Sequence, residues 1–355
     1  MPNLDISTLE AWNVREPVSK RAWCVLRLGS KDGLEGWGEC APLTASSLEA
    51  LKSAATGTAA TAYEALRTKL GSRGGAAAVN MACLDLASRG ANAPLHQFLG
   101  GPTRHKVRAF CTLHGDTDAA IGDSMKQASA AGFRAFGVPV PGVSTRNQGQ
   151  AFVHAAKKRM DTLRQAGGEN ADFVLHASGT IRAGDAASLA TALERFHLLW
   201  FDEPCDTRSL GALRKIADEN VTPVGFGQGL EDPAAFQNLL RDDAVDVLRP
   251  EIAAHGLSGV RKIAALAEVY YVAVAPRHGE GPITTAAALH LAASMPNFFI
   301  QHIPYPEAAA DREMRAAIAG AVETVSEGFA ALPGGLGLGI RVRREAMQKY
   351  GDRIA

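Results

Sequence analysis

The first forty residues alternate between apolar and polar positions, the pattern of β-strands with one buried face. Turn residues separate three such runs, and Lys31-Asp32-Gly33 between the second and third is a strong hairpin signal. Two alanine-rich stretches follow, at about 46–69 and 76–89, and their apolar residues recur at helical spacing. A β-meander followed by helices predicts an α+β domain over residues 1–105, which ends in a tract rich in Gly and Pro.

Beyond residue 106 the pattern changes to short, continuous apolar runs that alternate with alanine-rich helical stretches. Runs of this kind are typical of parallel strands that are buried on both faces. The predicted strands span residues 107–114, 134–140, 173–178, 198–204, 223–228, 245–251, 270–278 and 298–304. Eight such units favour a closed (β/α)8 barrel of the TIM type over an open Rossmann sheet, because the first strand lacks the Gly-rich fingerprint.

The predicted architecture is therefore an α/β protein with an N-terminal α+β capping domain and a (β/α)8 barrel. We expect the barrel to occupy residues 106–325. The remaining segment, 326–355, contains a Pro- and Gly-rich turn that enters a short strand. We expect this C-terminal tail to pack back toward the capping domain and complete it.

Composition and charge exclude several classes of function. Hydrophobic residues make up 46% of the chain and charged residues 21%, which is typical of a globular protein. Lys plus Arg equals Asp plus Glu at 37 each, so no net charge attracts nucleic acid or a membrane surface. The five cysteines form no CxxC pair, and no signal peptide or membrane-spanning run is evident. We expect a soluble, cytoplasmic protein with reduced thiols.

Polar side chains gather where the predicted barrel strands end. Barrel active sites lie at the carboxyl ends of the strands, so these residues are the candidates for chemistry. They are His114, His176, Ser178, Asp202, Glu203, Gln228, Glu251, Arg277, His278 and His302. Any one of them could fall there by chance, because strand ends meet solvent. Six consecutive strands each contribute at least one, so the set as a whole indicates a site.

Several runs of the sequence resemble the mandelate racemase and muconate lactonizing branch of the enolase superfamily. GLEGWGECAPL resembles the hairpin of that family's capping domain, and AVNMACLDLASRGANAPLHQFLGG resembles the helix leading to its barrel. LLWFDEP, PVGFGQGLEDPAAF and FFIQHIP resemble barrel strands, and LPGGLGLGI resembles the closing turn. The resemblance covers nearly the whole chain. It implies removal of the proton α to a carboxylate, an enolate held on Mg²⁺ by three carboxylates, and assembly into homo-oligomers.

The chain departs from that family pattern at the metal ligands. The resemblance places His176, Asp202 and Gln228 at the three ligand positions, with Glu203 beside Asp202. The formal charge of the ligands then falls from three negatives to one, and neutral imidazole suits zinc better than magnesium. Two interpretations stay open. These four residues bind a divalent metal, Mg²⁺ or Zn²⁺, or they are the remnant of a metal site.

The proton-transfer positions depart from the pattern as well. Gly137 and Pro139 stand where the family commonly has lysines, and neither can move a proton. The resemblance puts Arg277, followed by His278, at the histidine of a catalytic dyad, and Glu251 at the aspartate. His302 replaces a usual glutamate on the last strand. Loss of several such groups is expected to abolish the ancestral reaction nearly completely unless others replace them.

We therefore predict a rewired site in which His176, His302 and His278 act as acid and base. Arg277 would hold an anionic substrate or pair with Glu251. The alternative is that Glu251 and Arg277 form a structural ion pair and that the histidines are satisfied within a polar pocket.

Residues 15–22 are expected to form a loop that closes over the substrate. Arg15, Lys20 and Arg21 would make this loop cationic, and His114 at the end of the first barrel strand could face the same pocket. A solvated loop and an exposed histidine are the alternatives.

The leading functional prediction is an isomerase or lyase that abstracts the α-proton of a small carboxylate such as a sugar acid or hydroxy acid. The alternative is a non-catalytic relative that binds a small acid or a partner protein. Metal-free hydrolysis or cyclisation by His176 and His302 is a third interpretation.

Overall fold

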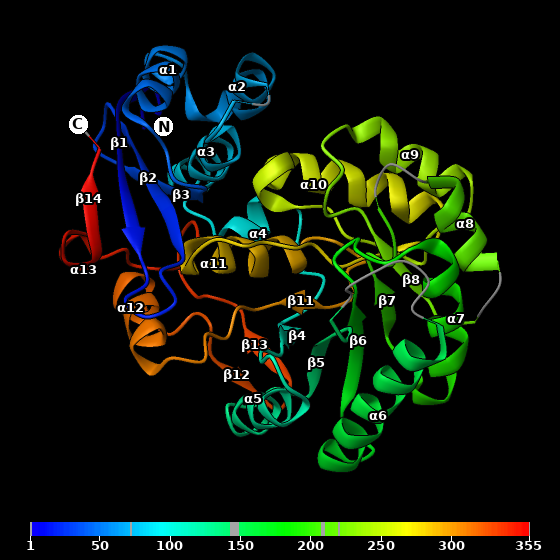
Figure 1. Ribbon diagram of the computed structural model, residues 1–355. Helices are drawn as coiled ribbons and strands as arrows, with labels where there is room; N and C mark the ends of the chain where they lie inside the picture. The colour runs from blue at the N-terminus through cyan, green and yellow to red at the C-terminus, as the bar shows by residue number, and fades with distance from the viewer. Residues whose placement is uncertain (1, 72, 143–148, 207–209, 219–220, 355) are drawn as a thin grey trace.

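The computed structural model describes residues 2–71, 73–142, 149–206, 210–218 and 221–354 and shows a small domain docked on a barrel (Figure 1). The small domain contains both ends of the chain, although most of its residues precede the barrel. In the described part of the chain, no helix is both long enough and apolar enough to cross a membrane.

The small domain is a four-stranded antiparallel sheet covered by helices. Its strands, in the order β14-β1-β2-β3, are β14 (Gly351–Arg353), β1 (Ile6–Arg15), β2 (Ala22–Ser30) and β3 (Glu35–Cys40). The helices are α1 (Ala45–Ala55), α2 (Tyr63–Leu70) and α3 (Ala76–Gly90), with a 3₁₀ turn η1 (Ala60–Ala62). The single helix expected over residues 46–69 is thus two helices. The chain turns between them at Gly57, whose φ of +79° suits glycine.

Helix α3 packs closely on β3 because two glycines of that strand have no side chain. A Cβ atom at Gly36 would lie 2.1 Å from the carbonyl oxygen of Ala82, and one at Gly38 would lie 2.2 Å from that of Ala78. The alternation of glycine in GLEGWGEC therefore sets the distance between the helix and the sheet.

The barrel contains all eight predicted strands, and the predicted fold class is confirmed. They are β4 (Lys106–Thr112), β5 (Ala135–Pro139), β6 (Asp172–His176), β7 (Trp200–Asp202), β8 (Val224–Phe226), β9 (Val247–Leu248), β10 (Ala273–Val274) and β11 (Gln301–His302). Neighbouring strands from β4 to β10 are parallel in chain order, and β11 pairs with β4. A bridge between Val274 and Phe298 closes the cylinder. Most strands are shorter than predicted, because several polar residues expected at their ends, such as Ser178, Glu203 and Gln228, lie in the loops that follow.

Helices surround the barrel strands (Figure 1). They are α5 (Asp118–Ala130), α6 (Gly149–Gly167), α7 (Ala183–Leu193), α8 (Leu210–Asp218), α9 (Pro233–Arg241), α10 (Ile252–Val269), α11 (Pro282–Ala292) and α12 (Ala309–Ala319). Shorter elements are α4 (Leu95–Phe98) before the barrel and η2 (Glu194–Phe196) after α7.

A layer of apolar side chains fills the interior of the barrel. Its buried members are Phe110, Ala135, Val174, Trp200, Val247, Ala275 and Ile300. Trp200 has the largest side chain in this layer. It fits because Gly225 on β8 has no side chain; a Cβ atom at that position would lie 2.1 Å from the Trp200 ring. The layer forms a solid floor beneath the carboxyl ends of the strands.

The C-terminal tail links the barrel to the small domain. Hairpin β12 (Val325–Ser326) and β13 (Phe329–Ala331) pairs with β4. Helix α13 (Arg344–Tyr350) follows, and β14 then adds to the edge of β1. The tail therefore supplies the outermost strand of the capping sheet.

A buried glutamate joins the capping domain to the barrel. Glu39 on β3 is 1% exposed, and its Oε2 accepts a hydrogen bond of 2.8 Å from the backbone N–H of Thr284 in the first turn of α11. Helix N-termini favour negative charge, but burial outweighs this and raises the pKa of Glu39 from 4.5 to about 7.

We predict that this contact makes the docked structure less stable as the pH rises. Between pH 4.5 and 7 the folded protein holds a proton on Glu39 that the unfolded chain has lost. The contribution of Glu39 to the free energy of unfolding is therefore complete below pH 4.5. It falls by up to about 1.4 kcal/mol per pH unit until the pH exceeds the pKa of Glu39 in the folded protein. Urea unfolding at pH 5 and pH 8 should show a smaller difference for Glu39→Gln than for wild type. The exposed Glu49→Gln variant should behave like wild type, and an equal pH response in all three proteins would contradict the assignment.

Candidate active site

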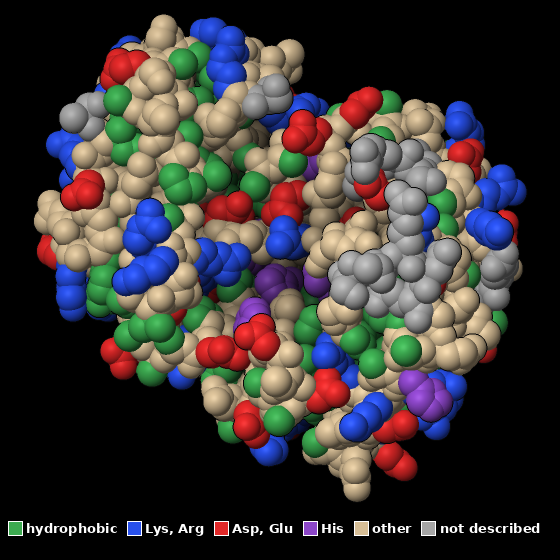
Figure 2. Space-filling model, viewed as in Figure 1, with side chains coloured by type: hydrophobic (Ala, Val, Ile, Leu, Met, Phe, Trp, Pro, Cys, Tyr) green, Lys and Arg blue, Asp and Glu red, His purple; other side chains and the backbone are tan. Residues whose placement is uncertain are grey.

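A cavity of about 500 Å³ lies between the capping domain and the carboxyl ends of the barrel strands. Figure 2 shows a hollow where the two domains meet, with histidine, basic and acidic side chains gathered in it. The barrel-strand lining includes Thr112, His114, His176, Asp202, Gln228, Arg249, Arg277 and His302. The capping domain contributes Glu16, Val18, Ser19 and Arg21.

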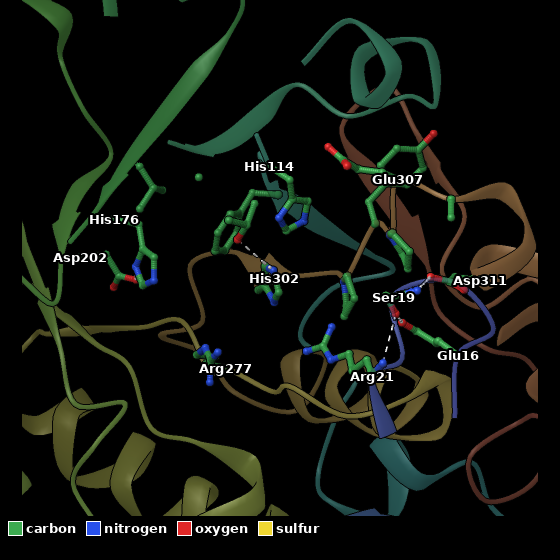
Figure 3. Close-up of a pocket in the computed structure, with 18 of the residues that line it drawn as sticks. Glu16, Ser19, Arg21, His114, His176, Asp202, Arg277, His302, Glu307 and Asp311 are labelled. Carbon is green, nitrogen blue, oxygen red and sulfur yellow. Dashed lines mark hydrogen bonds and ion pairs between the residues drawn. The ribbon is translucent and has the colours of Figure 1, made fainter. Parts of the chain in front are cut away.

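The loop that follows β1 is fastened over this cavity by helix α12. The buried Asp311 carboxylate accepts hydrogen bonds of 2.8 and 2.9 Å from the backbone N–H groups of Val18 and Ser19. Arg315 forms a 2.9 Å ion pair with Glu16, and both side chains are 1% exposed. The loop is therefore held beside the cavity by contacts between the two domains (Figure 3).

Asp202 is the centre of a dense hydrogen-bond network at the base of the cavity. Its Oδ2 accepts from Gln228 Nε2 at 2.7 Å and lies 2.9 Å from His176 Nδ1. Its Oδ1 accepts from Trp200 Nε1 at 2.8 Å and from Arg249 Nε at 2.9 Å. The structure thus brings His176, Asp202 and Gln228 together, as the sequence predicted from adjacent strand ends. Both carboxylate oxygens are already satisfied by these donors.

Arg249 is a buried cation in this network, and it is not among the candidate residues predicted from the sequence. It is 2% exposed, and its guanidinium lies over the rings of Phe110 and Trp200, with 5.6 and 5.1 Å from its central carbon to the ring centres. Burial alone would raise the pKa of Asp202, but the Arg249 charge and the contact with His176 outweigh it and hold the pKa at about 2. Asp202 and Arg249 are therefore a buried ion pair.

Glu203, proposed as a fourth ligand, does not join these residues. Its side chain accepts hydrogen bonds of 2.8 and 2.9 Å from the backbone N–H groups of Gly227 and Gln228, and it does not line the cavity. Burial and the neighbouring Asp202 charge raise the pKa of Glu203 to about 8. The carboxyl group secures the loop after β8.

The three remaining rim histidines differ in their access to the cavity. His302 lines it, with Nε2 3.2 Å from Thr112 Oγ1, while Nδ1 has no hydrogen-bond partner among the residues that the structure describes. Burial and the nearby His278 and arginines hold the pKa of His302 well below 6.5, so its imidazole is neutral. His114 also lines the cavity. His278 is fully buried behind His302, with ring centres 6.2 Å apart, and does not reach the cavity.

Two arginines bring positive charge to the cavity. Arg277 lines it and donates a 2.6 Å hydrogen bond to Glu251, whose pKa burial raises to about 7. Arg21, on the capping side, forms no ion pair within the described ranges of the chain. Burial and the neighbouring Arg315 lower the pKa of Arg21. An anion bound between Arg21 and Arg277 would relieve this unfavourable environment.

The other two cations predicted for the loop, Arg15 and Lys20, donate hydrogen bonds to backbone carbonyl groups of the loop itself. Arg15 donates a 2.9 Å hydrogen bond to the carbonyl of Lys20, and Lys20 donates one of 2.7 Å to the carbonyl of Pro17. Neither lines the cavity. Figure 3 shows Arg21 and Arg277 on the same side of the open space as His302, with His176 and Asp202 at one end and the capping loop at the other.

The fold and the cavity together define a cap-covered barrel enzyme. Residues 9–100 match the mandelate racemase / muconate lactonizing enzyme N-terminal domain, and residues 120–346 match the enolase C-terminal domain-like family. The chain therefore belongs to the mandelate racemase/muconate lactonizing enzyme family of the enolase superfamily. Its enzyme class is that of the hydro-lyases and isomerases of this family.

Curated relatives with similar sequences include sugar-acid dehydratases. A D-galactonate dehydratase of Verminephrobacter eiseniae is 29% identical over 76% of this chain and 75% of its own length. A D-galactonate dehydratase of Ralstonia pickettii is 31% identical over 61% of this chain and 56% of its own length. A D-xylonate dehydratase of Haloferax volcanii is 27% identical over 62% of this chain and 56% of its own length.

Solved structures share the fold over almost the entire chain. A mandelate racemase/muconate lactonizing enzyme-like protein from Rubrobacter xylanophilus superposes with a TM-score of 0.87 at 23% identity, covering 99% of this chain and 98% of its own. A mandelate racemase/muconate lactonizing enzyme from Sulfitobacter sp. has a TM-score of 0.86 at 24% identity, covering 98% and 95%.

Members of the enolase superfamily typically use Mg²⁺, and the donors in this cavity do not fit that ion. Mg²⁺ requires several oxygen ligands, usually carboxylates and water. Asp202 is the one carboxylate that the described barrel strands present to the cavity, and its oxygens accept from Trp200, Gln228 and Arg249. The Arg249 guanidinium would also repel a second cation bound beside Asp202.

Proposed function

We propose that this enzyme dehydrates a sugar acid, by removing the proton α to the carboxylate and expelling the β-hydroxyl group as water. The observation that carries the proposal is the grouping of Arg21, Arg277 and the neutral His302 around one cavity. The similarity to D-galactonate and D-xylonate dehydratases supports the choice of a polyhydroxy carboxylate as substrate.

In this proposal the two arginines bind the substrate carboxylate. Guanidinium groups pair well with carboxylates, and their positive charge stabilises the negative charge that spreads onto the carboxylate as the α-proton leaves. Arg277 is fixed by Glu251, and Arg21 is carried by the fastened loop. Both cations are therefore in place before the substrate arrives.

His302 is the base in this reaction. A neutral imidazole can accept the α-proton through Nε2, which lies 3.2 Å from Thr112 Oγ1 in the cavity lining, whereas Nδ1 is buried. The C–H electrons form the double bond of the enol, the bond to the β-hydroxyl breaks, and the proton held by His302 leaves with that oxygen as water. The remaining enol becomes a 2-keto-3-deoxy acid. All charge stabilisation in this route comes from side chains of the chain itself.

The proposal predicts turnover of aldonates in deuterated water. Purified protein incubated with D-galactonate, D-xylonate and related aldonates should replace the α-proton by deuterium or form the keto acid, as measured by NMR. Arg21→Ala should lower kcat/KM by about 10²-fold because a charge-assisted contact to the carboxylate is lost. The matched control is Lys20→Asn, which removes one positive charge from the same loop but not from the cavity, and it should retain activity.

The outcome separates two activities within the enzyme class. Exchange without keto-acid formation would identify an isomerase in place of a hydro-lyase. Absence of both reactions across the aldonate panel would contradict the proposed function.

A further inference from the structure

Ser178 takes no part in the dehydration proposed above, yet its hydroxyl lies against the imidazole of His176. The distance from Ser178 Oγ to His176 Nε2 is 3.0 Å, and His176 Nδ1 lies 2.9 Å from Asp202 Oδ2. A hydroxyl, an imidazole and a carboxylate connected through opposite ring nitrogens are the arrangement of a nucleophilic serine with its base and its orienting acid.

The Asp202 carboxylate is held by more hydrogen bonds than the one to His176. Asp202 is 2% exposed and receives donors from Trp200, Gln228 and Arg249 as well. It therefore stays ionised and cannot rotate away from the ring. An ionised carboxylate at Nδ1 keeps the proton on that nitrogen, which leaves Nε2 free to accept the proton of the serine.

The backbone around Ser178 holds the hydroxyl in a tight turn directly after β6. Ser178 has a φ of +54°, a conformation that residues other than glycine rarely adopt. The flanking Gly179 N–H donates a 2.8 Å hydrogen bond to the carbonyl of Glu203, and Thr180 N–H donates one of 3.1 Å to that of Ala177. Ser178 is exposed to solvent, while the imidazole that it contacts lines the cavity. Substrate can therefore reach the hydroxyl.

We propose that Ser178, His176 and Asp202 form a nucleophilic triad that hydrolyses an ester of a hydroxy acid, specifically the internal ester of an aldonolactone. Ser178 Oγ attacks the carbonyl carbon as its proton passes to His176 Nε2. The ring C–O bond then breaks, and the departing oxygen takes that proton from His176. Water, with His176 as base, next attacks the acyl-serine, and Ser178 and the free aldonate are released.

The choice of a lactone rests on the proposed function, whereas the triad itself does not. The product of lactone opening is a polyhydroxy carboxylate, the anion that Arg21 and Arg277 are proposed to bind in the cavity that His176 and Asp202 also line. Ester hydrolysis would thus supply the acid that the dehydration consumes.

A fluorophosphonate probe tests the nucleophile in the absence of any aldonate. The probe should label Ser178 covalently, as located by mass spectrometry of the digested protein. Ser178→Ala should abolish the labelling, and His176→Asn should slow it by at least about 10²-fold because the base is lost. Ser188→Ala, which removes an exposed serine on α7, is the control and should be labelled like wild type.

Two results would overturn the inference. An activated serine is excluded if Ser178 stays unlabelled in the wild-type protein. It is also excluded if folded His176→Asn is labelled at the same rate as wild type. Circular dichroism verifies that each variant is folded. If Ser178 is labelled but an aldonolactone is opened no faster than it opens spontaneously in a pH-stat, the assignment of the lactone substrate is wrong. Failure of the dehydration reaction alone leaves the labelling result intact, so the two proposals fail separately.

Discussion

His302→Asn is expected to lower the rate of α-proton exchange by about 10²–10⁴-fold, the contribution usual for a general base. The effect should appear mainly in kcat, because His302 is proposed to act on the proton and the arginines to bind the carboxylate. Asparagine keeps a polar side chain beside Thr112 but cannot accept the proton. Deuterium incorporation into the substrate, measured by NMR, gives the rate directly.

The pH dependence and a second histidine provide the controls for this prediction. Because the pKa of His302 lies well below 6.5, its base form is already complete at neutral pH, and protonation of His302 should not slow exchange between pH 8 and 7. His105→Asn removes an exposed imidazole outside the cavity and should exchange like wild type. A His302→Asn variant with the exchange rate of wild type would exclude this residue as the base.

Arg249→Met should destabilise the fold by about 3–5 kcal/mol, the cost of leaving a buried charge without its partner. Methionine fills much of the arginine stem's volume above Trp200, so the main loss is electrostatic. Asp202, which is 2% exposed in the wild-type protein, would lose its guanidinium donor. Denaturant unfolding of the purified variant measures the change.

A double-mutant cycle separates the charge from the packing. Adding Asp202→Asn to Arg249→Met removes the unpaired anion and should restore most of the lost stability, because a neutral pair costs less to bury than a single charge. If the two substitutions instead destabilise the protein additively, the ion pair is not the reason for the loss.

The sequence was sufficient for the barrel because its strands are buried on both faces. Continuous apolar runs mark all eight strands, and the order of the chain is the order of the sheet. The break between α1 and α2 was not predicted. Apolar spacing continues on both sides of Gly57, but the chain leaves the helix at Thr56, whose ψ of 134° is not helical, and turns at Gly57 with its positive φ.

The site could be predicted as a group of residues but not as a network. His176 and Asp202 end adjacent parallel strands and Gln228 follows the next one, so their proximity follows from the fold. Arg249 is 47 residues from Asp202, and a strand of two residues is too short for alternation to indicate which side chain points inward. Whether neighbouring polar groups face an ion or one another depends on this buried cation.

The sequence also could not predict which cation of the capping loop reaches the cavity. Arg15, Lys20 and Arg21 are equivalent as cations in the sequence, and the turn of the loop decides which one reaches the cavity. The positive φ of Lys20 and the two carbonyl contacts direct Arg15 and Lys20 toward the loop backbone. Arg21 alone of the three faces the substrate space.

Whether the cavity activates the α-proton without a metal ion can be tested by deuterium exchange at the α-carbon of an aldonate. The exchange rate is measured after exhaustive treatment with a chelator and again after addition of Mg²⁺. We expect the same rate in both samples, because the arginines provide the positive charge and Arg249 already neutralises Asp202. Exchange that disappears with the chelator and returns with Mg²⁺ would show that the cavity rearranges to bind the ion, and would contradict the account.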